Sequence, residues 1–296
     1  MNAPRTLLAA TDFSDHARHA AERAARLAHE TGALLTLMHV QPVAALLALR
    51  QWLGQGHAAE AHLLAQTAQQ LQILADGLQA AHKVPVRAVT TSGQVLDDLL
   101  REAAQQQAAL LVLGAKGVGF VRRLALGSTS ERLLRRTQLP LLVVRQKPHE
   151  AYRRALVAVD FSAWSLKSLA LVRQVAPHAQ LVLMTVYQVP FEEKLRFAGV
   201  DAATVDHYRQ QTKAEALQQV HLLAQTAGLK PGHWEPCVVE GEAWQRIIEQ
   251  EQARDCDLVA MGKHGQSVTE DLLLGSVTQR VLAEGDTDVL VSTTHG

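Results

Sequence analysis

The chain has 296 residues, and its 29 Lys and Arg residues balance 29 Asp and Glu residues, so the formal net charge is zero. Proteins that bind nucleic acids or anionic membranes usually carry a basic excess, and single-stranded nucleic acids usually stack on aromatic side chains, which make up only 4% of this chain. We therefore expect neither a nucleic acid nor a membrane as a partner. The length suggests about two domains, and the 48% of hydrophobic residues can build packed cores.

The termini and cysteines predict a cytoplasmic protein. The first apolar run ends at Asp12, which is too short for a signal peptide with its cleavage site. No uncharged apolar run reaches the roughly 18 residues that a membrane-spanning helix needs. The two cysteines, Cys237 and Cys256, form neither a disulfide framework nor a CxxC pair, as expected in a reducing compartment.

The first half of the chain alternates apolar strands with helices. Thr6–Thr11 is a predicted buried strand, Ser14 is a favourable N-cap for the next helix, and Gly32 is a favourable end for it. The elements predicted after that helix are strand Ala33–Val40, a long helix to about His82, strand Val84–Thr91, helix Gln94–Gln106, strand Leu110–Leu113, helix Ser128–Arg136 and strand Pro140–Arg145. Continuous apolar strands that alternate with helices are typical of a parallel sheet with helices on both faces.

The second half repeats the first at a spacing of 148 residues, half the chain length. Leu7–Ser14 (LLAATDFS) returns as Ala155–Ser162 (ALVAVDFS), although the spacing is 146 around the second strand. The strands predicted for this half are Arg154–Val159, Gln180–Val186, Trp234–Val239, Leu258–Met261 and Asp288–Ser292. A period this long indicates a domain duplication. We predict domains at residues 1–147 and 152–296, joined by the polar segment Gln146–Ala151.

A glycine-rich loop follows the fourth strand of each half, with the same two spacings. The matching residues are Gly114, Gly117, Gly127, Ser128 and Ser130 in the first half and Gly262, Gly265, Gly275, Ser276 and Thr278 in the second. Glycines let backbone N–H groups turn toward an anion, the N-terminus of the following helix favours phosphate, and the hydroxyl groups can donate further hydrogen bonds. Recurrence in both halves favours a binding site over a simple turn and helix cap.

Asp12 and Asp160 lie where the first strand of each half ends, and two interpretations of them stay open. Asp-Phe-Ser before a helix is good capping chemistry. The carboxyl ends of strands are also where ligands bind on open α/β sheets.

This arrangement resembles the universal stress protein family over essentially the whole chain, as two tandem domains. Both loops match the pattern G-x2-G-x9-G-[ST] of the family's ATP-binding branch. The resemblance implies two Rossmann-like α/β domains, each a doubly wound parallel five-stranded sheet, with a regulatory role in stress responses. It also implies bound ATP, ADP or AMP, together with Mg²⁺.

The resemblance assigns roles to particular residues. Asp12 and Asp160 would approach the adenine, and Val40 and Val186 would face it through their backbone. The loop glycines and the serine after the last glycine would hold ribose and phosphates. Single-domain relatives pair through the last strand, so we expect the apolar segments Leu141–Val144 and Val289–Val291 to pair within one chain, with a homodimer as a further possibility.

Two functional classes remain, namely a regulatory nucleotide-binding protein and a slow ATPase or self-phosphorylating phosphotransferase that uses the same loops. The chain lacks the P-loop pattern, a G-x-G-x-x-G after the first strand and a G-x-S-x-G nucleophile elbow. No residue type that is repeated in both halves offers a base or nucleophile for the γ-phosphate, which disfavours the enzyme. The sequence names no protein partner.

The two sites need not be equal. Arg122 and Arg123 in the first loop are replaced by Glu270 and Asp271 in the second, so the sites will differ if either pair reaches the phosphates. We expect the second site to bind more tightly, because its loop is closer to the family pattern and solvent screens charges in the spacer.

Overall fold

The computed structural model describes residues 5–47, 57–116, 127–189, 197–198, 200–265 and 274–293. The chain divides into two compact units between Ala151 and Tyr152, and each unit is described by itself. The second unit extends to Ser292.

The first unit contains a five-stranded parallel sheet. Its elements in chain order are β1 (Thr6–Ala10), α1 (Asp15–Thr31), β2 (Leu34–Pro42), α3 (His57–His82), β3 (Val86–Gly93), α4 (Val95–Gln105), β4 (Ala108–Gly114), α5 (Ser128–Arg136) and β5 (Leu141–Val144). The strands lie in the order β3-β2-β1-β4-β5, and every neighbouring pair is parallel.

The second unit repeats this arrangement. Its elements are β6 (Arg154–Ala158), α6 (Ala163–Val175), β7 (Gln180–Tyr187), α8 (Ala202–Thr226), β8 (Trp234–Glu240), α9 (Ala243–Ala253), β9 (Leu258–Gly262), α10 (Ser276–Glu284) and β10 (Asp288–Ser292). The strand order is β8-β7-β6-β9-β10, again with parallel neighbours throughout.

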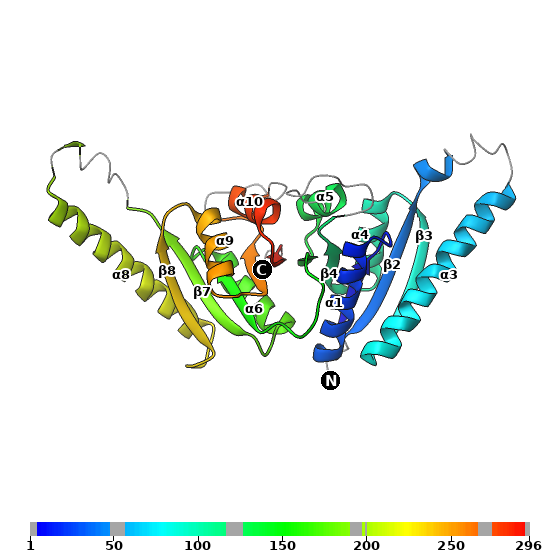
Figure 1. Cartoon of the computed structure of the whole chain (residues 1–296), viewed down its shortest axis with the longest axis horizontal. Coiled ribbons are helices and arrows are strands. Elements are labelled where there is room, and N and C mark those ends of the chain that lie inside the picture. The colour runs from blue at the N-terminus through cyan, green and yellow to red at the C-terminus, as the bar shows by residue number, and fades with distance from the viewer. Residues whose placement is uncertain are drawn as a thin grey trace. The chain divides into compact units, whose positions relative to one another are not determined.

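The strand order places helices on both faces of each sheet. The chain moves in one direction from β1 to β3 and in the other direction from β3 through β4 to β5, so right-handed crossovers put α1 and α3 on one face and α4 and α5 on the other. In agreement, α1 contacts α3 and α4 contacts α5, while α9 contacts α10 in the second unit. Figure 1 shows the long helices α3 and α8 beside the strands β3 and β8 that follow them.

The direction of the chain reverses between β1 and β4 in the first unit and between β6 and β9 in the second. At such a topological switch point the connections leave the carboxyl ends of two neighbouring strands in opposite directions, which opens a crevice there. The strands beside the crevice form the core, with fully buried Leu8 on β1 and Leu111 on β4.

The fold class predicted from the sequence is confirmed, and most element bounds agree to within two residues. Helix α1 begins after the predicted cap, since the Ser14 hydroxyl accepts a hydrogen bond from Ala17 N–H, and it ends at Gly32, whose φ of 68° is left-handed. Strand β3 begins at Val86 and not at the predicted Val84, after Pro85, which has no N–H group for the sheet.

Candidate functional site

The first unit has a cavity of about 300 Å³ where the carboxyl ends of β1, β2 and β4 meet the N-terminus of α5. Six residues singled out from the sequence lie in its wall, and they are Asp12, Val40, Gly114, Gly127, Ser128 and Ser130. Gly117 lies outside the described residues, as do Arg122 and Arg123.

The second unit has a cavity of about 210 Å³ at the corresponding place. All seven residues predicted for this half lie in its wall, and they are Asp160, Val186, Gly262, Gly265, Gly275, Ser276 and Thr278. Glu270 and Asp271 lie outside the described residues. Residues separated by more than 100 positions in the sequence therefore meet in one cavity in each unit.

The aspartate at the end of the first strand belongs both to a turn and to the cavity. Asp12 Oδ1 accepts hydrogen bonds from Ser14 N at 3.1 Å and from Ser14 Oγ at 2.6 Å, and Asp160 makes the same pair of contacts with Ser162. The residue between the aspartate and the serine has a positive φ in both units, 65° at Phe13 and 63° at Phe161, which is rare outside glycine. This tight turn fixes the carboxylate while the same residue lines the cavity.

The two ends of each glycine loop are tied together by backbone hydrogen bonds. Gly127 N–H donates to the Ala115 carbonyl at 2.8 Å, and Gly275 N–H donates to the Lys263 carbonyl at 2.9 Å. A Cβ atom built on Gly265 would lie 3.1 Å from Asp160 Oδ2, so the glycine lets the loop approach the carboxylate closely.

The first turn of α5 and of α10 faces its cavity. The N–H groups of Ser128, Thr129 and Ser130 come too early in α5 to have a partner within the helix, so they are available to an acceptor in the cavity. The hydroxyl groups of Ser130 and Thr278 have another role, because they donate to the carbonyls of Gly114 at 3.1 Å and Gly262 at 2.9 Å. These two side chains link the start of the helix to the end of the strand. Their hydroxyl protons are already engaged in these hydrogen bonds.

The two cavities differ at positions that the duplication pairs. Lys116 lines the first cavity, and its counterpart His264 lines the second. His39 lies in the wall of the first cavity and has no histidine counterpart in the second. Its Nδ1 lies 2.8 Å from the Thr11 carbonyl oxygen, and because a carbonyl oxygen only accepts, Nδ1 carries the hydrogen and donates it. Trp164, the counterpart of His16, lines the second cavity and faces the His264 ring at a centroid distance of 5.8 Å.

Apolar residues complete both walls, and sequence analysis missed them. The paired positions are Met38 and Met184, Leu99 and Ile247, and Leu113 and Met261. Leu99 and Ile247 come from α4 and α9, which pack beside the cavities through the tertiary fold. Alignment of the two halves was the available signal, because each pair consists of large apolar residues at matching positions.

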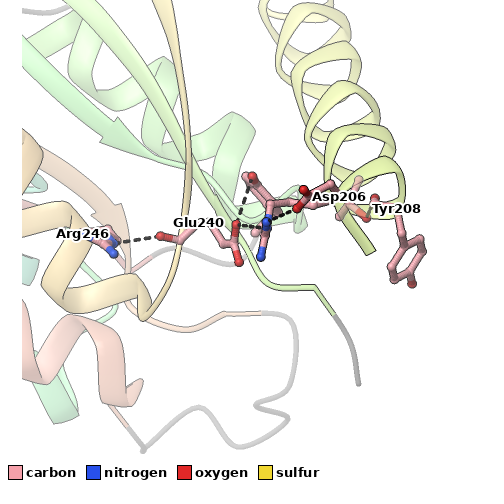
Figure 2. A network of polar contacts seen from close by, with 7 residues as sticks. Asp206, Tyr208, Glu240 and Arg246 are labelled. Carbon is pink, nitrogen blue, oxygen red and sulfur yellow. Dashed lines mark hydrogen bonds and ion pairs between the residues drawn. The ribbon is translucent and has the colours of Figure 1, made fainter. Parts of the chain in front are cut away.

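A polar network holds the start of α9 in the second unit. Arg209 on α8 lies 3.1 Å from the Glu240 carboxylate at the end of β8, and Arg246 Nε donates to the Glu240 carbonyl at 2.8 Å. Figure 2 shows Glu240 between the helices, with Tyr208 pointing away from the network. Gly241 follows with a φ of 139°, and a Cβ there would lie 2.5 Å from Arg246 Nε. The network thus orients α9, which supplies two residues to the cavity wall.

Two histidines of the first unit have lowered pKa values. Burial is the main cause for both, and the nearby positive charges of Lys116, His19 and Arg145 lower the pKa of His16 further against the opposing effect of Asp15. His82 is affected in the same direction by burial and by a neighbouring arginine. The folded protein therefore takes up these two protons less readily than the unfolded chain does.

This difference predicts a loss of stability in mild acid. The free energy of unfolding should not depend on these two groups well above their ordinary pKa of 6.5 and should decrease as the pH falls from there through the lowered values. Chemical denaturation between pH 8 and 5 measures this decrease, which the double substitution His16→Gln and His82→Gln should reduce. The same substitution at the exposed His149 is the matched control, and an equal reduction there would contradict the assignment.

In the part of the chain that the structure describes, no three His, Cys, Asp or Glu side chains are grouped as a metal site. Within the same residues, no helix has the length and hydropathy needed to cross a membrane.

Comparisons with known proteins agree with this arrangement. The universal stress protein family matches residues 4–145 and again residues 151–293. A universal stress protein from Mycolicibacterium smegmatis is 26% identical over 96% of both chains, and one from Thermus aquaticus is 31% identical over 48% of this chain and 98% of its own length.

Solved structures show the same fold. The crystal structure of a universal stress protein from Archaeoglobus fulgidus superposes with a TM-score of 0.68 over 98% of both chains at 16% identity. That of a putative universal stress protein from Pseudomonas aeruginosa has a TM-score of 0.60 at 17% identity and covers 98% of this chain and 93% of its own. Because the family matches both halves in turn and the fold is the same, this chain belongs to the universal stress protein family, as two tandem copies of its domain.

Proposed function

We propose that each unit binds one adenine nucleotide and that the protein is a nucleotide-dependent regulator of a stress response in the cytoplasm. The observation that carries the proposal is the recurrence of one cavity at the switch point of both sheets, each lined by the ends of a G-x2-G-x9-G-S loop. In this arrangement the helix N-terminus and the loop backbone receive the phosphates. The apolar wall and the fixed aspartate receive the base.

The residues present suit a nucleotide that brings its own Mg²⁺. Magnesium in nucleotide sites is usually held by substrate phosphates, water and one or two carboxylates, so a dedicated protein cage is not required. Among the described residues, the only carboxylates in the cavity walls are Asp12 and Asp160, which approach the base in this proposal, so the phosphates and water would hold the ion.

Ligand released from purified, denatured protein identifies the nucleotide directly. We expect mass spectrometry to find ATP, ADP or AMP at up to two equivalents per chain, and calorimetry with added ATP and Mg²⁺ to give the same stoichiometry with ligand-free protein. A chain that releases no nucleotide and binds none of the three in calorimetry contradicts the proposal.

The alternative function is a slow ATPase or a self-phosphorylating phosphotransferase. Two of the hydroxyls beside the loops do not favour it, because those of Ser130 and Thr278 donate to backbone carbonyls and so lack a base that could activate them. We expect ATP turnover far below the typical enzymatic range of about 1–1000 per second. Rapid Mg²⁺-dependent phosphate release that survives stringent purification and is lost on Gly275→Val would favour the enzyme.

We also propose that the last strands of the two copies, β5 and β10, pair within one chain. Leu141–Val144 and Val289–Val291 are apolar and belong to the last strand in the order of each unit, and an uncovered apolar edge strand promotes aggregation. Separately expressed halves should therefore associate in analytical ultracentrifugation, and Val143→Lys should weaken that association. Halves that stay monomeric at high concentration would contradict the pairing, and a dimer of full-length chains would show in the same experiment.

A further inference from the structure

Basic side chains are concentrated beside the phosphate end of the first cavity. Lys116 lies in the cavity wall, between the first two glycines of the loop, Gly114 and Gly117. His16 and His19 lie on the first turns of α1, and Arg145 directly follows β5. The rings of His16 and His19 lie 6.2 Å apart, and the charges of Lys116, His19 and Arg145 all lower the pKa of His16.

The second cavity has an aromatic group at the same place. Trp164 replaces His16, and its indole contacts both the His264 ring, at a centroid distance of 5.8 Å, and the Lys167 ammonium group, which is 4.9 Å from the ring centroid. The indole contributes apolar surface to the wall and a single hydrogen-bond donor. The Lys167 ammonium group lies over the face of the Trp164 ring. The second cavity is also smaller than the first, with a volume of about 210 Å³ compared with about 300 Å³.

We propose that the two sites select nucleotides by phosphate charge, with the first site strongly preferring ATP to AMP through Lys116 and the second, shaped by Trp164 and His264, discriminating much less. This inference rests on the proposed nucleotide binding. A lysine that meets an additional phosphate forms a charge-assisted hydrogen bond, which is about twice as strong as a neutral one. A histidine in contact with an indole carries no fixed ammonium group and offers no equivalent contact to the longer phosphate chain.

The measurement is calorimetry of ATP and AMP binding, without divalent cations so that the charge difference between the two nucleotides is greatest. The Gly275→Val variant lacks the second site, so its titration reports on the first, and the Gly127→Val variant reports on the second in the same way. Titration of the wild type, fitted with two sites, gives the same comparison without a glycine substitution. The ratio of the AMP to the ATP dissociation constant should be at least about tenfold larger at the first site. It should also fall more steeply there as the salt concentration rises.

Exchange of the paired loop residues tests the cause. Lys116→His should lower the ratio at the first site by about tenfold, and His264→Lys should raise it at the second. Lys83→Ala is the control, because Lys83 lies between α3 and β3, at the amino end of β3, whereas the cavity lies at the carboxyl ends of the strands. This substitution removes the same charge and should leave both ratios unchanged. Circular dichroism verifies that each variant is folded.

The possible outcomes separate this inference from the proposed function. Binding of both nucleotides at both sites with equal ratios would overturn charge selection and leave nucleotide binding intact. The same holds if Lys116→His changes ATP and AMP affinity equally. Binding of neither nucleotide at either site would overturn the proposed function itself.

Discussion

The substitutions Gly127→Val and Gly275→Val should each remove one equivalent of bound adenine nucleotide. The double substitution should remove both equivalents. Phosphate has to approach the backbone at the start of α5 and α10, and a branched side chain at the N-cap would occupy that space. Binding should fall below detection at the altered site, while the other site keeps its affinity. Calorimetry with ATP and Mg²⁺ on the wild type and the three variants measures the stoichiometry.

The backbone conformation at both positions suits valine, and circular dichroism of each variant verifies that it is folded. The φ angles of Gly127 and Gly275 are −62° and −58°, values that any residue adopts. A Cβ on Gly275 would lie 3.2 Å from the Lys263 carbonyl oxygen and 3.5 Å from His264 Cα, distances that need only small adjustments. Unchanged stoichiometry in a folded Gly275→Val protein would exclude the loop as the binding element.

Ser128→Ala and Ser276→Ala are the matched milder variants. Each removes one hydroxyl group from the cavity wall and keeps the backbone, so affinity should fall by about 0.5–1.5 kcal/mol, or up to about 3 kcal/mol if the partner is a charged phosphate. The same titrations also rank the two sites, for which the sequence predicts tighter binding at the second. Retention of the tighter site in Gly275→Val would reverse that order.

The sequence predicted the fold well because the duplication doubled every local signal. The Asp-Phe-Ser turn, the strand before it and the glycine loop occur twice, and the structure places each pair at the same point of two equivalent sheets. Helix α5 has the predicted bounds, Ser128–Arg136, because a glycine N-cap and the basic residues of its last turn define both ends locally.

The parts of the candidate site that the sequence did not predict depend on contacts between distant elements. Leu99 reaches the first cavity only because α4 packs beside the carboxyl ends of β2 and β4. The ring contact between Trp164 and His264 joins residues 100 positions apart, and nothing in either local segment indicates it. The hydroxyl of Ser130 was expected to donate to phosphate, and only the geometry shows that it donates to Gly114 instead.

Alanine substitutions at Gly114 and Gly77 should change the stability of the protein in opposite directions. A Cβ on Gly114 would lie 2.7 Å from the His16 carbonyl carbon, 2.8 Å from its oxygen and 2.9 Å from Ala17 N. These are backbone atoms in the first turn of α1, so the end of β4 and the helix must move apart. Overpacking of this kind typically costs about 1–3 kcal/mol, and here it also displaces the turn that holds the cavity wall.

Gly77 provides the control, because it lies within α3, where an added Cβ would meet no atom within 4 Å. Gly77→Ala should stabilise the protein by roughly 0.5–1 kcal/mol, since alanine loses less backbone entropy than glycine on entering a helix. Urea denaturation followed by circular dichroism measures both changes. If the Gly114→Ala variant is as stable as the wild type, the close approach of β4 to α1 is wrong. If the variant is destabilised and also binds one equivalent of nucleotide less, the contact between β4 and α1 positions the first site as well as stabilising the fold.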